Sequence, residues 1–397
     1  MSSFIIPIGP QHPALKEPEH FTFFVDGEYV TDVKVRIGYM HRGIEKAMED
    51  RTYNQGIYLA SRICGICTEA HTTCFVQNVE YAMDLKPPRR AEFIRVILCE
   101  LNRLQSHMLW IGAGGHEIGF DTLFMYLWRD RERVLDILEL ITGNRITYAM
   151  MAVGGVRRDI TSDMIAKIQK AMDIVEERAK YYKKVVLSEQ SIMARTIGIG
   201  TLTPREALEL CSVGPILRAS GIKSDVRADD PYAAYDETPF NVITYDGCDV
   251  YSRFLVRVDE MFESINIIRY CLDHMPQDPI RIKLVKVAPE GEAVSRVEAP
   301  RGELIHYLMG KGDVKPYRYK IRAPTLGILP SLVRMLTSRE NYVVKIGDIP
   351  AIVGGIDPCF CCTDRAVKFI DVSKGKTWSC SYDELNKYAN RRYRKVG

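Results

Sequence analysis

The stretch Ile356-Asp-Pro-Cys-Phe-Cys-Cys-Thr-Asp-Arg365 places Cys359, Cys361 and Cys362 within four residues, close to the end of the chain. Near the beginning, Arg62-Ile-Cys-Gly-Ile-Cys-Thr-Glu-Ala-His71 carries a second pair of thiols. Both stretches contain the spacing C-x-x-C, which lets two sulfur atoms converge on one metal centre. If all these thiols serve one centre, the fold has to bring the two ends of the chain together.

The distance between the two pairs indicates what kind of site they would form. Zinc ribbons usually place their pairs about 15–20 residues apart in a small module, whereas Cys67 and Cys359 lie near opposite ends of this chain. Such a separation favours a buried metal centre between distant parts of a large fold. Each pair alone could equally be packed thiols, and four thiolates suit zinc, Cu(I), nickel or iron, including an iron–sulfur cluster.

The composition is that of a globular protein. Of the 397 residues, 46% are hydrophobic and 26% charged, and a chain of this length can bury a core without disulfides. The net charge of +3 is too small to indicate a nucleic-acid partner. There is no run of 18 apolar residues and no basic leader, so we expect a cytosolic or membrane-peripheral protein whose 11 cysteines are reduced.

Hydrophobic periodicity predicts an α+β fold with a mainly helical core of long helices and β elements near both ends. Residues 20–36 alternate on both sides of Asp26-Gly27 like a hairpin, and the chain from about 280 has the pattern of short strands and turns, with a hairpin over 314–321. Helical spacing predicts one long helix that starts at about residue 89 and three more over 122–142, 161–186 and 251–268.

The two cysteine stretches resemble the paired signatures of the large subunit of nickel–iron hydrogenases, R-x-C-G-x-C-x-x-x-H and D-P-C-x-x-C. The ending in Arg365 is similar to the membrane-bound, energy-converting group, in which arginine stands where other hydrogenases have histidine. That group is related to the quinone-site subunit of respiratory complex I, which lacks the four thiols. Shared blocks extend the resemblance over nearly the whole chain: Gly9-Pro-Gln-His-Pro-Ala14, His41-Arg-Gly-Ile-Glu-Lys46, Leu101-Asn-Arg-Leu-Gln-Ser-His107 and Gly214-Pro-Ile-Leu-Arg-Ala-Ser-Gly221.

The resemblance implies a nickel–iron centre whose iron carries CO and two cyanides. Cys64 and Cys359 would be terminal nickel ligands, and Cys67 and Cys362 would bridge nickel and iron. This sequence keeps all four thiols, which is the strongest argument that the chain holds a working metal centre.

The resemblance also implies catalytic roles beside the metal. Glu45 matches a carboxylate that relays protons. Arg301, in Ala299-Pro-Arg-Gly-Glu-Leu-Ile-His306, matches an arginine placed over the open metal position, where a cation can stabilise developing charge. Without the resemblance, Glu45 would be interpreted as a residue that caps or pairs on a helix surface, and Pro-Arg-Gly as a turn.

Further residues are expected to support the centre. His71 would hydrogen-bond a bridging sulfur. Thr325 would donate to a cyanide, although Leu326-Gly-Ile-Leu follows where relatives have an asparagine. Asp357 would either accept backbone N–H bonds that fix the ligand loop or bind Arg62.

The implied activity is the reversible reduction of protons to H2. The chain shows no cluster motif beyond the four assigned thiols, so another subunit has to carry electrons to the metal centre. The resemblance implies a partner small subunit with a [4Fe-4S] cluster, which receives electrons from ferredoxin-linked electron-transfer subunits. Membrane subunits that translocate ions would complete the complex, and this chain would lie on the cytoplasmic side of the membrane as a peripheral subunit. Two alternatives stay open: a nickel-free redox module for quinone or sulfur, and a zinc-stabilised interaction subunit.

The resemblance divides the chain into a domain like the hydrogenase large subunit over 1–365 and a C-terminal extension over 366–397. In many relatives a maturation protease removes such an extension after nickel insertion. We therefore predict a processing site after Arg365.

Overall fold

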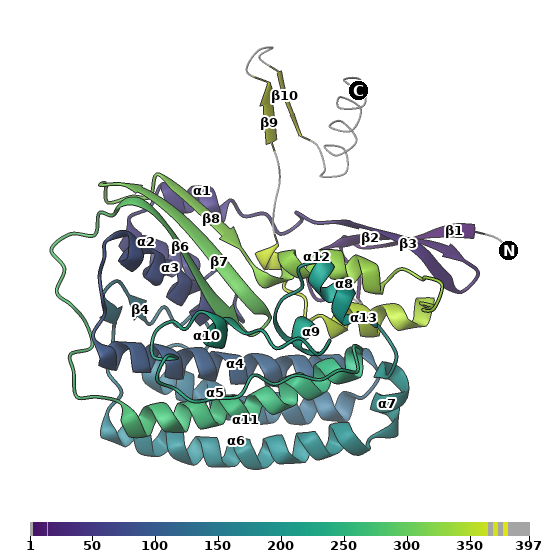
Figure 1. Ribbon diagram of the computed structural model, residues 1–397, viewed down its shortest axis with the longest axis horizontal. Helices are drawn as coiled ribbons and strands as arrows, with labels where there is room; N and C mark the ends of the chain where they lie inside the picture. The colour runs from purple at the N-terminus through teal and green to yellow at the C-terminus, as the bar shows by residue number, and fades with distance from the viewer. Residues whose placement is uncertain (1–2, 14, 364–367, 372–375, 380–397) are drawn as a thin grey trace.

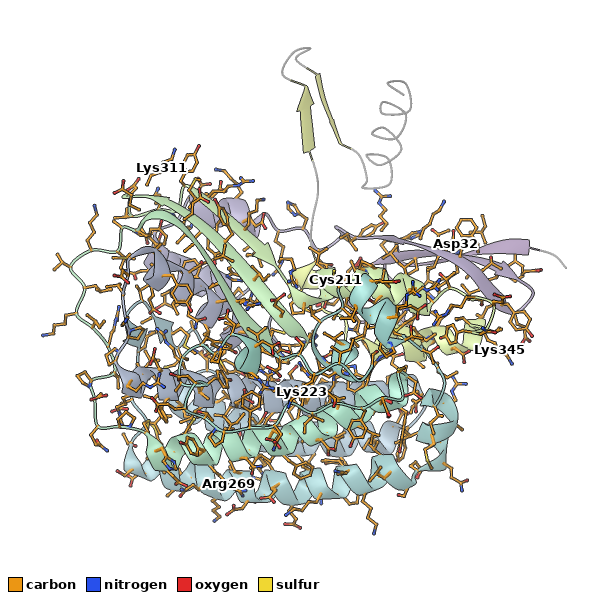
Figure 2. All side chains as sticks on the ribbon, viewed as in Figure 1. Asp32, Cys211, Lys223, Arg269, Lys311 and Lys345 are labelled. Carbon is orange, nitrogen blue, oxygen red and sulfur yellow. The ribbon has the colours of Figure 1, made fainter. Side chains whose placement is uncertain are left out.

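The computed structural model describes residues 3–13, 15–363, 368–371 and 376–379. Long helices form a bundle along one side, and small antiparallel sheets lie above and beside it (Figure 1). This arrangement confirms the predicted α+β fold with a mainly helical core. Figure 2 shows that side chains fill the space between the bundle and the sheets.

The strands are β1 (Ser3–Ile8), β2 (His20–Asp26), β3 (Tyr29–Arg36), β4 (Met151–Ala152), β5 (Gly155–Val156), β6 (Glu290–Ala299), β7 (Gly302–Lys311), β8 (Arg318–Arg322), β9 (Lys368–Asp371) and β10 (Lys376–Ser379). The helices are α1 (Ile44–Glu49), α2 (Tyr53–Ala60), α3 (Thr68–Ala82), α4 (Arg89–Glu117), α5 (Asp121–Thr142), α6 (Ser162–Ser188), α7 (Gln190–Thr196), α8 (Pro204–Glu209), α9 (Gly214–Arg218), α10 (Val226–Asp229), α11 (Val250–His274), α12 (Pro324–Met335) and α13 (Ile349–Gly355), with 3-10 turns η1 (Ile346–Asp348) and η2 (Phe360–Cys362).

Helix α4 is the central element of the bundle. It packs against α5 and α11, and α6 in turn packs against those two helices. Its apolar positions Leu98, Leu101, Leu104 and Met108 are completely buried, as their helical spacing predicts. The predicted stop of α5 is also confirmed, because Gly143 follows the helix in the left-handed conformation with a φ of 84°. Among the described residues, no helix combines the length and apolar character of a membrane span.

Two three-stranded sheets flank the bundle. Strands β2 and β3 form the predicted hairpin, and β1 adds a third strand that the sequence pattern did not predict. Strands β6 and β7 have ten residues each, so they are longer than the predicted short strands. Residues of β7 alternate between buried and half-buried positions because the sheet lies on α3.

The apolar interior consists of two cores that meet at the C-terminal cysteines. The larger core surrounds α3, α4, α5 and α11 and includes Cys359. The smaller core lies between the N-terminal sheet and helices α12 and α13, and it includes Phe360, whose ring contacts Phe21 edge-on. The cysteine-containing turn is therefore fixed on both sides by packed side chains.

A buried ion pair joins α3 and α4 to the β4–β5 hairpin. Arg95 donates two hydrogen bonds to Glu80, at 2.7 and 2.9 Å, and both side chains are 2% exposed. Arg95 also donates to the carbonyls of Ala152 and Gly155, and the Gly154 N–H donates to Glu80. The ion pair therefore ties the backbone of the short hairpin to both helices.

Replacing Glu80 with alanine should lower the free energy of unfolding by about 3–5 kcal/mol, because it leaves the Arg95 guanidinium buried without its anion. Denaturant unfolding measures this loss. The double variant Glu80→Met/Arg95→Met should recover part of it, and Glu209→Ala in the exposed pair with Arg205 is the matched control. A loss no larger than that of the control would contradict the assignment.

Candidate metal centre

The two cysteine stretches meet in the interior of the structure. The sulfur atoms of Cys64 and Cys359 lie 3.2 Å apart, although 295 residues separate them in the sequence. The sulfur of Cys362 lies 2.9 Å from that of Cys359. Cys64 precedes the N-terminus of α3, and Cys359 and Cys362 lie at the two ends of the turn η2. The fold thus places thiols from both ends of the chain at one buried point.

Cys361, which was not among the four expected ligands, also lies with these thiols. Among the described residues, the thiols of Cys64, Cys359, Cys361 and Cys362 form a group whose sulfur atoms all lie within 4.8 Å of one another. Cys67 stands outside that group, and its sulfur accepts a hydrogen bond from Nη1 of Arg301 at 3.1 Å. The adjacent Cys64 thiol and burial raise the pKa of the Cys67 thiol.

The N-terminal cysteine loop is held by side chains from outside it. Arg42 donates to the carbonyls of Arg62 and Ile63 at 2.9 and 2.7 Å, and to the carbonyl of Cys361 at 3.3 Å. Asn102 and Gln105 of α4 both donate to the carbonyl of Ile66, at 2.7 and 2.9 Å. Arg42 therefore fastens the two cysteine loops to each other, a role that could not be assigned from the sequence.

The C-terminal cysteine loop has its own supports. Asp357 begins it with a φ of 55°, a left-handed conformation that aspartate tolerates better than most residues. The backbone N–H of Cys359 donates to Oγ1 of Thr325 at 3.1 Å, and that of Cys361 donates to a Glu17 carboxylate oxygen at 2.9 Å. Thr325 thus contacts the backbone of an expected ligand. The predicted processing site Arg365 lies outside the described residues.

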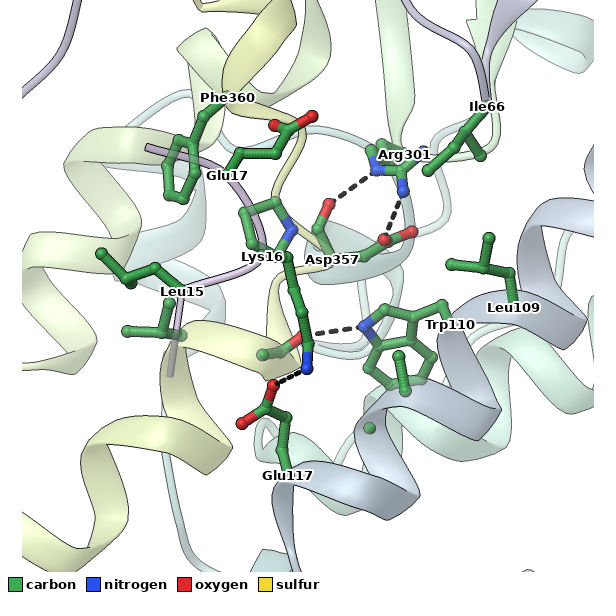
Figure 3. A pocket seen from close by; sticks show the side chains of 15 residues that line it. Leu15, Lys16, Glu17, Ile66, Leu109, Trp110, Glu117, Arg301, Asp357 and Phe360 are labelled. Carbon is green, nitrogen blue, oxygen red and sulfur yellow. Dashed lines mark hydrogen bonds and ion pairs between the residues drawn. The ribbon is translucent and has the colours of Figure 1, made fainter. Parts of the chain in front are cut away.

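Arg301 occupies the tight turn between β6 and β7, where Ala299 pairs with Gly302. Its guanidinium is buried and donates to Asp357 twice, from Nη2 to Oδ1 at 2.5 Å and from Nε to the backbone carbonyl at 2.7 Å (Figure 3). The turn interpretation and the functional interpretation of Pro-Arg-Gly are therefore compatible. The hairpin tip carries a fixed cation to the sulfur atom of Cys67.

The expected pairing of Asp357 with Arg62 is not found. Arg62 is exposed and donates to the carbonyl of Tyr58 and the hydroxyl of Ser61. Asp357 is 3% exposed and binds Arg301 instead. A buried carboxylate needs a buried cation, and Arg301 satisfies this need because the β6–β7 hairpin reaches into the core.

His71 lies beside the thiols at the end of a short chain of polar groups. Its Nε2 is 3.7 Å from the sulfur of Cys362, its Nδ1 is 3.1 Å from Nε2 of His306, and His306 contacts the hydroxyl of Tyr319 at 2.5 Å. Burial lowers the pKa of His71 to about 4, so the imidazole is neutral at physiological pH. The second histidine, which orients the first, was not assigned from the sequence.

Glu45 lies on α1 and contacts strand β8. Its carboxylate accepts from Nζ of Lys320 at 2.6 Å and from the N–H of Ile321 at 3.0 Å, which joins α1 to β8. The side chain of Glu45 is 28% exposed. The structure therefore gives Glu45 the pairing that the sequence alone indicated, and its relay role stays a prediction.

A cavity of about 190 Å³ opens next to the Arg301–Asp357 pair. Figure 3 shows Trp110 and Leu109 of α4 on one side and Phe360 on the other, with Lys16 and Glu117 paired at 2.7 Å below. The Trp110 indole donates to the Gly354 carbonyl. Most of the lining is apolar, so the cavity can admit a small uncharged molecule to the vicinity of the site.

The residues present fit a nickel–iron centre. Buried thiolates are soft donors that select thiophilic metals, and Cys64, Cys67, Cys359 and Cys362 would hold the two metals. The N–H groups of Ile66 and Cys67 both donate to the Cys64 sulfur at 3.3 Å, which stabilises a thiolate there. The buried guanidinium of Arg301 offsets negative charge on the sulfur atoms.

Comparison with known proteins connects this site to two related groups. The family described as the 49 kDa subunit of respiratory-chain NADH dehydrogenase matches residues 117–290 and 283–365. The family described as nickel-dependent hydrogenase matches residues 42–111, which include the N-terminal cysteine pair.

Individual relatives align over most of the chain. Formate hydrogenlyase subunit 5 of Escherichia coli is 41% identical, over 98% of this chain and 67% of its own length. Membrane-bound hydrogenase subunit alpha of Pyrococcus furiosus is 38% identical, over 91% and 87%. A subunit of the F420H2 dehydrogenase of Methanosarcina mazei is 39% identical, over 92% and 98%.

Replacing Thr325 with valine should loosen the C-terminal cysteine loop, because the buried N–H of Cys359 would lose its acceptor at a cost of about 1–3 kcal/mol. Hydrogen–deuterium exchange of the peptide 356–363 should become about tenfold faster or more. Thr325→Ser keeps the hydroxyl and should exchange like the unchanged protein. Equal exchange in Thr325→Val and Thr325→Ser would contradict this role of the hydroxyl.

Proposed function

Because this chain belongs to the family that comprises the 49 kDa subunit of respiratory-chain NADH dehydrogenase and membrane-bound nickel-dependent hydrogenases, we propose that it is the catalytic subunit of a membrane-bound hydrogenase. The reaction would be the reversible reduction of protons to H2. The observation that carries the proposal is the meeting of two distant C-x-x-C pairs, with Cys64 and Cys359 in sulfur–sulfur contact.

A nickel–iron centre, when bound, supplies the chemistry by which H2 is split into protons and electrons or formed from them. The residues of this chain would hold that centre, keep water away from it and move the proton. Cys64 and Cys359 are 2% exposed and Cys362 is half-buried, so the Cys64–Cys359 side of the site is closed to bulk water. Arg301 is fixed by three hydrogen bonds to Asp357 and Cys67, so its charge needs no reorganisation during reaction.

Proton movement would use groups on the β8 side of the site. Glu45 reaches partly into solvent and forms an ion pair with Lys320, which suits a carboxylate that exchanges protons with the outside. His71 and Thr325 would position the ligand loops rather than react. These roles come from the match to the family's motifs and from the contacts described above.

The partners follow from the same proposal. The relatives from Escherichia coli and Pyrococcus furiosus are named as subunits, and we propose that this chain also acts in a complex. A small subunit with a [4Fe-4S] cluster would pass electrons from ferredoxin-linked subunits. Ion-translocating membrane subunits would hold the assembly on the cytoplasmic side of the membrane.

A second candidate function is a nickel-free redox module that acts on quinone or sulfur. The similarity to the F420H2 dehydrogenase relative and the match to the 49 kDa subunit favour it. The clustered buried thiols favour the hydrogenase instead, because a quinone or sulfur cavity has no need of four converging sulfur atoms.

We also propose that the chain is cleaved after Arg365 during maturation. The hydrogenase domain would cover 1–365, and a maturation protease would remove 366–397 once the metal is inserted. The intact mass of the subunit in the native complex reads this boundary directly.

Metal analysis and infrared spectroscopy of the native complex should detect nickel with iron and the bands of bound CO and cyanide. Cys64→Ser should remove nickel, because one of its terminal thiolates is lost. Cys211→Ser, at an exposed cysteine that the ligand assignment does not use, is the control. A complex that contains neither nickel nor these bands would favour the redox module, and zinc alone would favour the interaction subunit.

Glu45→Gln and Arg301→Lys should separate proton transfer from the reaction at the metal. Both variants should retain nickel. Glu45→Gln should lose hydrogen–deuterium exchange between H2 and water, since an amide cannot relay protons. Arg301→Lys should turn over about 100-fold more slowly, because a point charge replaces the fixed fork. Full exchange in Glu45→Gln, or full turnover in Arg301→Lys, would remove that residue from the mechanism.

A further inference from the structure

Cys361 has no role in the nickel–iron assignment, yet its thiol lies among the proposed ligands. Its sulfur is 3.3 Å from that of Cys359 and 3.9 Å from that of Cys362. The residue is half-buried, and both polar groups of its backbone are bound: the N–H donates to Glu17 and the carbonyl accepts from Arg42. The position of this thiol is therefore set by the fold and not by chance contact.

Cys67 is oriented differently. Its sulfur is hydrogen-bonded to the Arg301 guanidinium, and the sulfur group within 4.8 Å consists of the other four thiols among the described residues. The structure thus contains a complete set of four sulfur donors in which Cys361 takes the place of Cys67.

We propose that, in the chain without its nickel–iron centre, Cys64, Cys359, Cys361 and Cys362 form a tetrathiolate site for a thiophilic divalent cation of the zinc class. This inference rests on the proposed function because three of these thiols also serve the nickel–iron centre. Cys361 is then an exchangeable ligand. It completes the site before metal insertion and yields to Cys67 afterwards.

The geometry suits a tetrahedral ion. Metal–sulfur bonds of about 2.3 Å place the sulfur atoms of such a site about 3.8 Å apart. The sulfur distances involving Cys359 are 2.9, 3.2 and 3.3 Å, and that between Cys361 and Cys362 is 3.9 Å. All six separations are within 4.8 Å, so each has to change by about 1 Å at most, which side-chain rotation can supply.

The charge balance also suits such an ion. Binding displaces the remaining thiol protons to solvent and involves no change of oxidation state. Four thiolates and one divalent cation carry a net negative charge. Arg42 lies at the edge of the group through its bond to the Cys361 carbonyl, and the N–H groups of Ile66 and Cys67 point at the Cys64 sulfur.

The test uses Co²⁺ as a spectroscopic substitute for zinc, with the full chain produced without nickel and kept reduced. One equivalent of Co²⁺ should give the visible bands of a tetrahedral site and sulfur-to-cobalt charge transfer for four thiolates. Cys67→Ser should keep this spectrum. Cys361→Ser should lose about a quarter of the charge-transfer intensity and bind Co²⁺ at least about tenfold more weakly.

Cys211→Ser, in the exposed position labelled in Figure 2, should behave like the unchanged chain, and far-ultraviolet circular dichroism of each variant checks its fold. The inference is overturned if the unchanged chain binds no Co²⁺, or if Cys67→Ser loses the fourth thiolate while Cys361→Ser keeps it. Absence of nickel and of the infrared bands from the native complex would instead overturn the proposed function and leave the cobalt result standing.

Discussion

The structure depends on bringing sulfur atoms from the two ends of the chain into contact inside a packed interior. Cys64 precedes α3 and Cys359 follows α13, and their sulfur atoms meet at 3.2 Å. Thiols this close are held by their surroundings rather than by attraction between them. Arg42 joins the two loops, and the turn that carries Cys359 and Phe360 is packed between two cores. The site is therefore a consequence of the whole fold.

The buried ion pair between Arg301 and Asp357 supports the cysteine site. Arg301 reaches the site from the tip of the β6–β7 hairpin, where Gly302 and Gly214 let two backbones approach closely: a Cβ on Gly302 would lie 2.7 Å from the Gly214 nitrogen. The Asp357 carboxylate compensates the charge of Arg301, and Asp357 is the first residue of the C-terminal cysteine loop. One ion pair thus connects the hairpin to the ligand turn, and the apolar cavity beside it gives small molecules room to approach.

The sequence predicted the features that local patterns determine. The stripe of α4, the glycine stop of α5 and the β2–β3 hairpin follow from side-chain periodicity and turn chemistry, and the structure confirms them. Sequence patterns could not predict contacts that exist only after folding. Three such contacts involve segments that are far apart in sequence. Asp357 pairs with Arg301 rather than Arg62, and Arg42 binds both cysteine loops. Cys361 lies among thiols from both ends of the chain. His306 could have been suspected, because it ends the same octapeptide as Arg301.

The central claim is that thiols from both ends of the chain bind one nickel-containing centre. X-ray absorption at the nickel edge of the native complex tests it most directly, because it reports which atoms surround the metal. We predict a nickel atom coordinated by four sulfur atoms, and no nickel signal when Cys64 is replaced with serine. Nickel bound mainly by nitrogen or oxygen, or a full nickel signal with the same sulfur count after the Cys64 replacement, would contradict this claim.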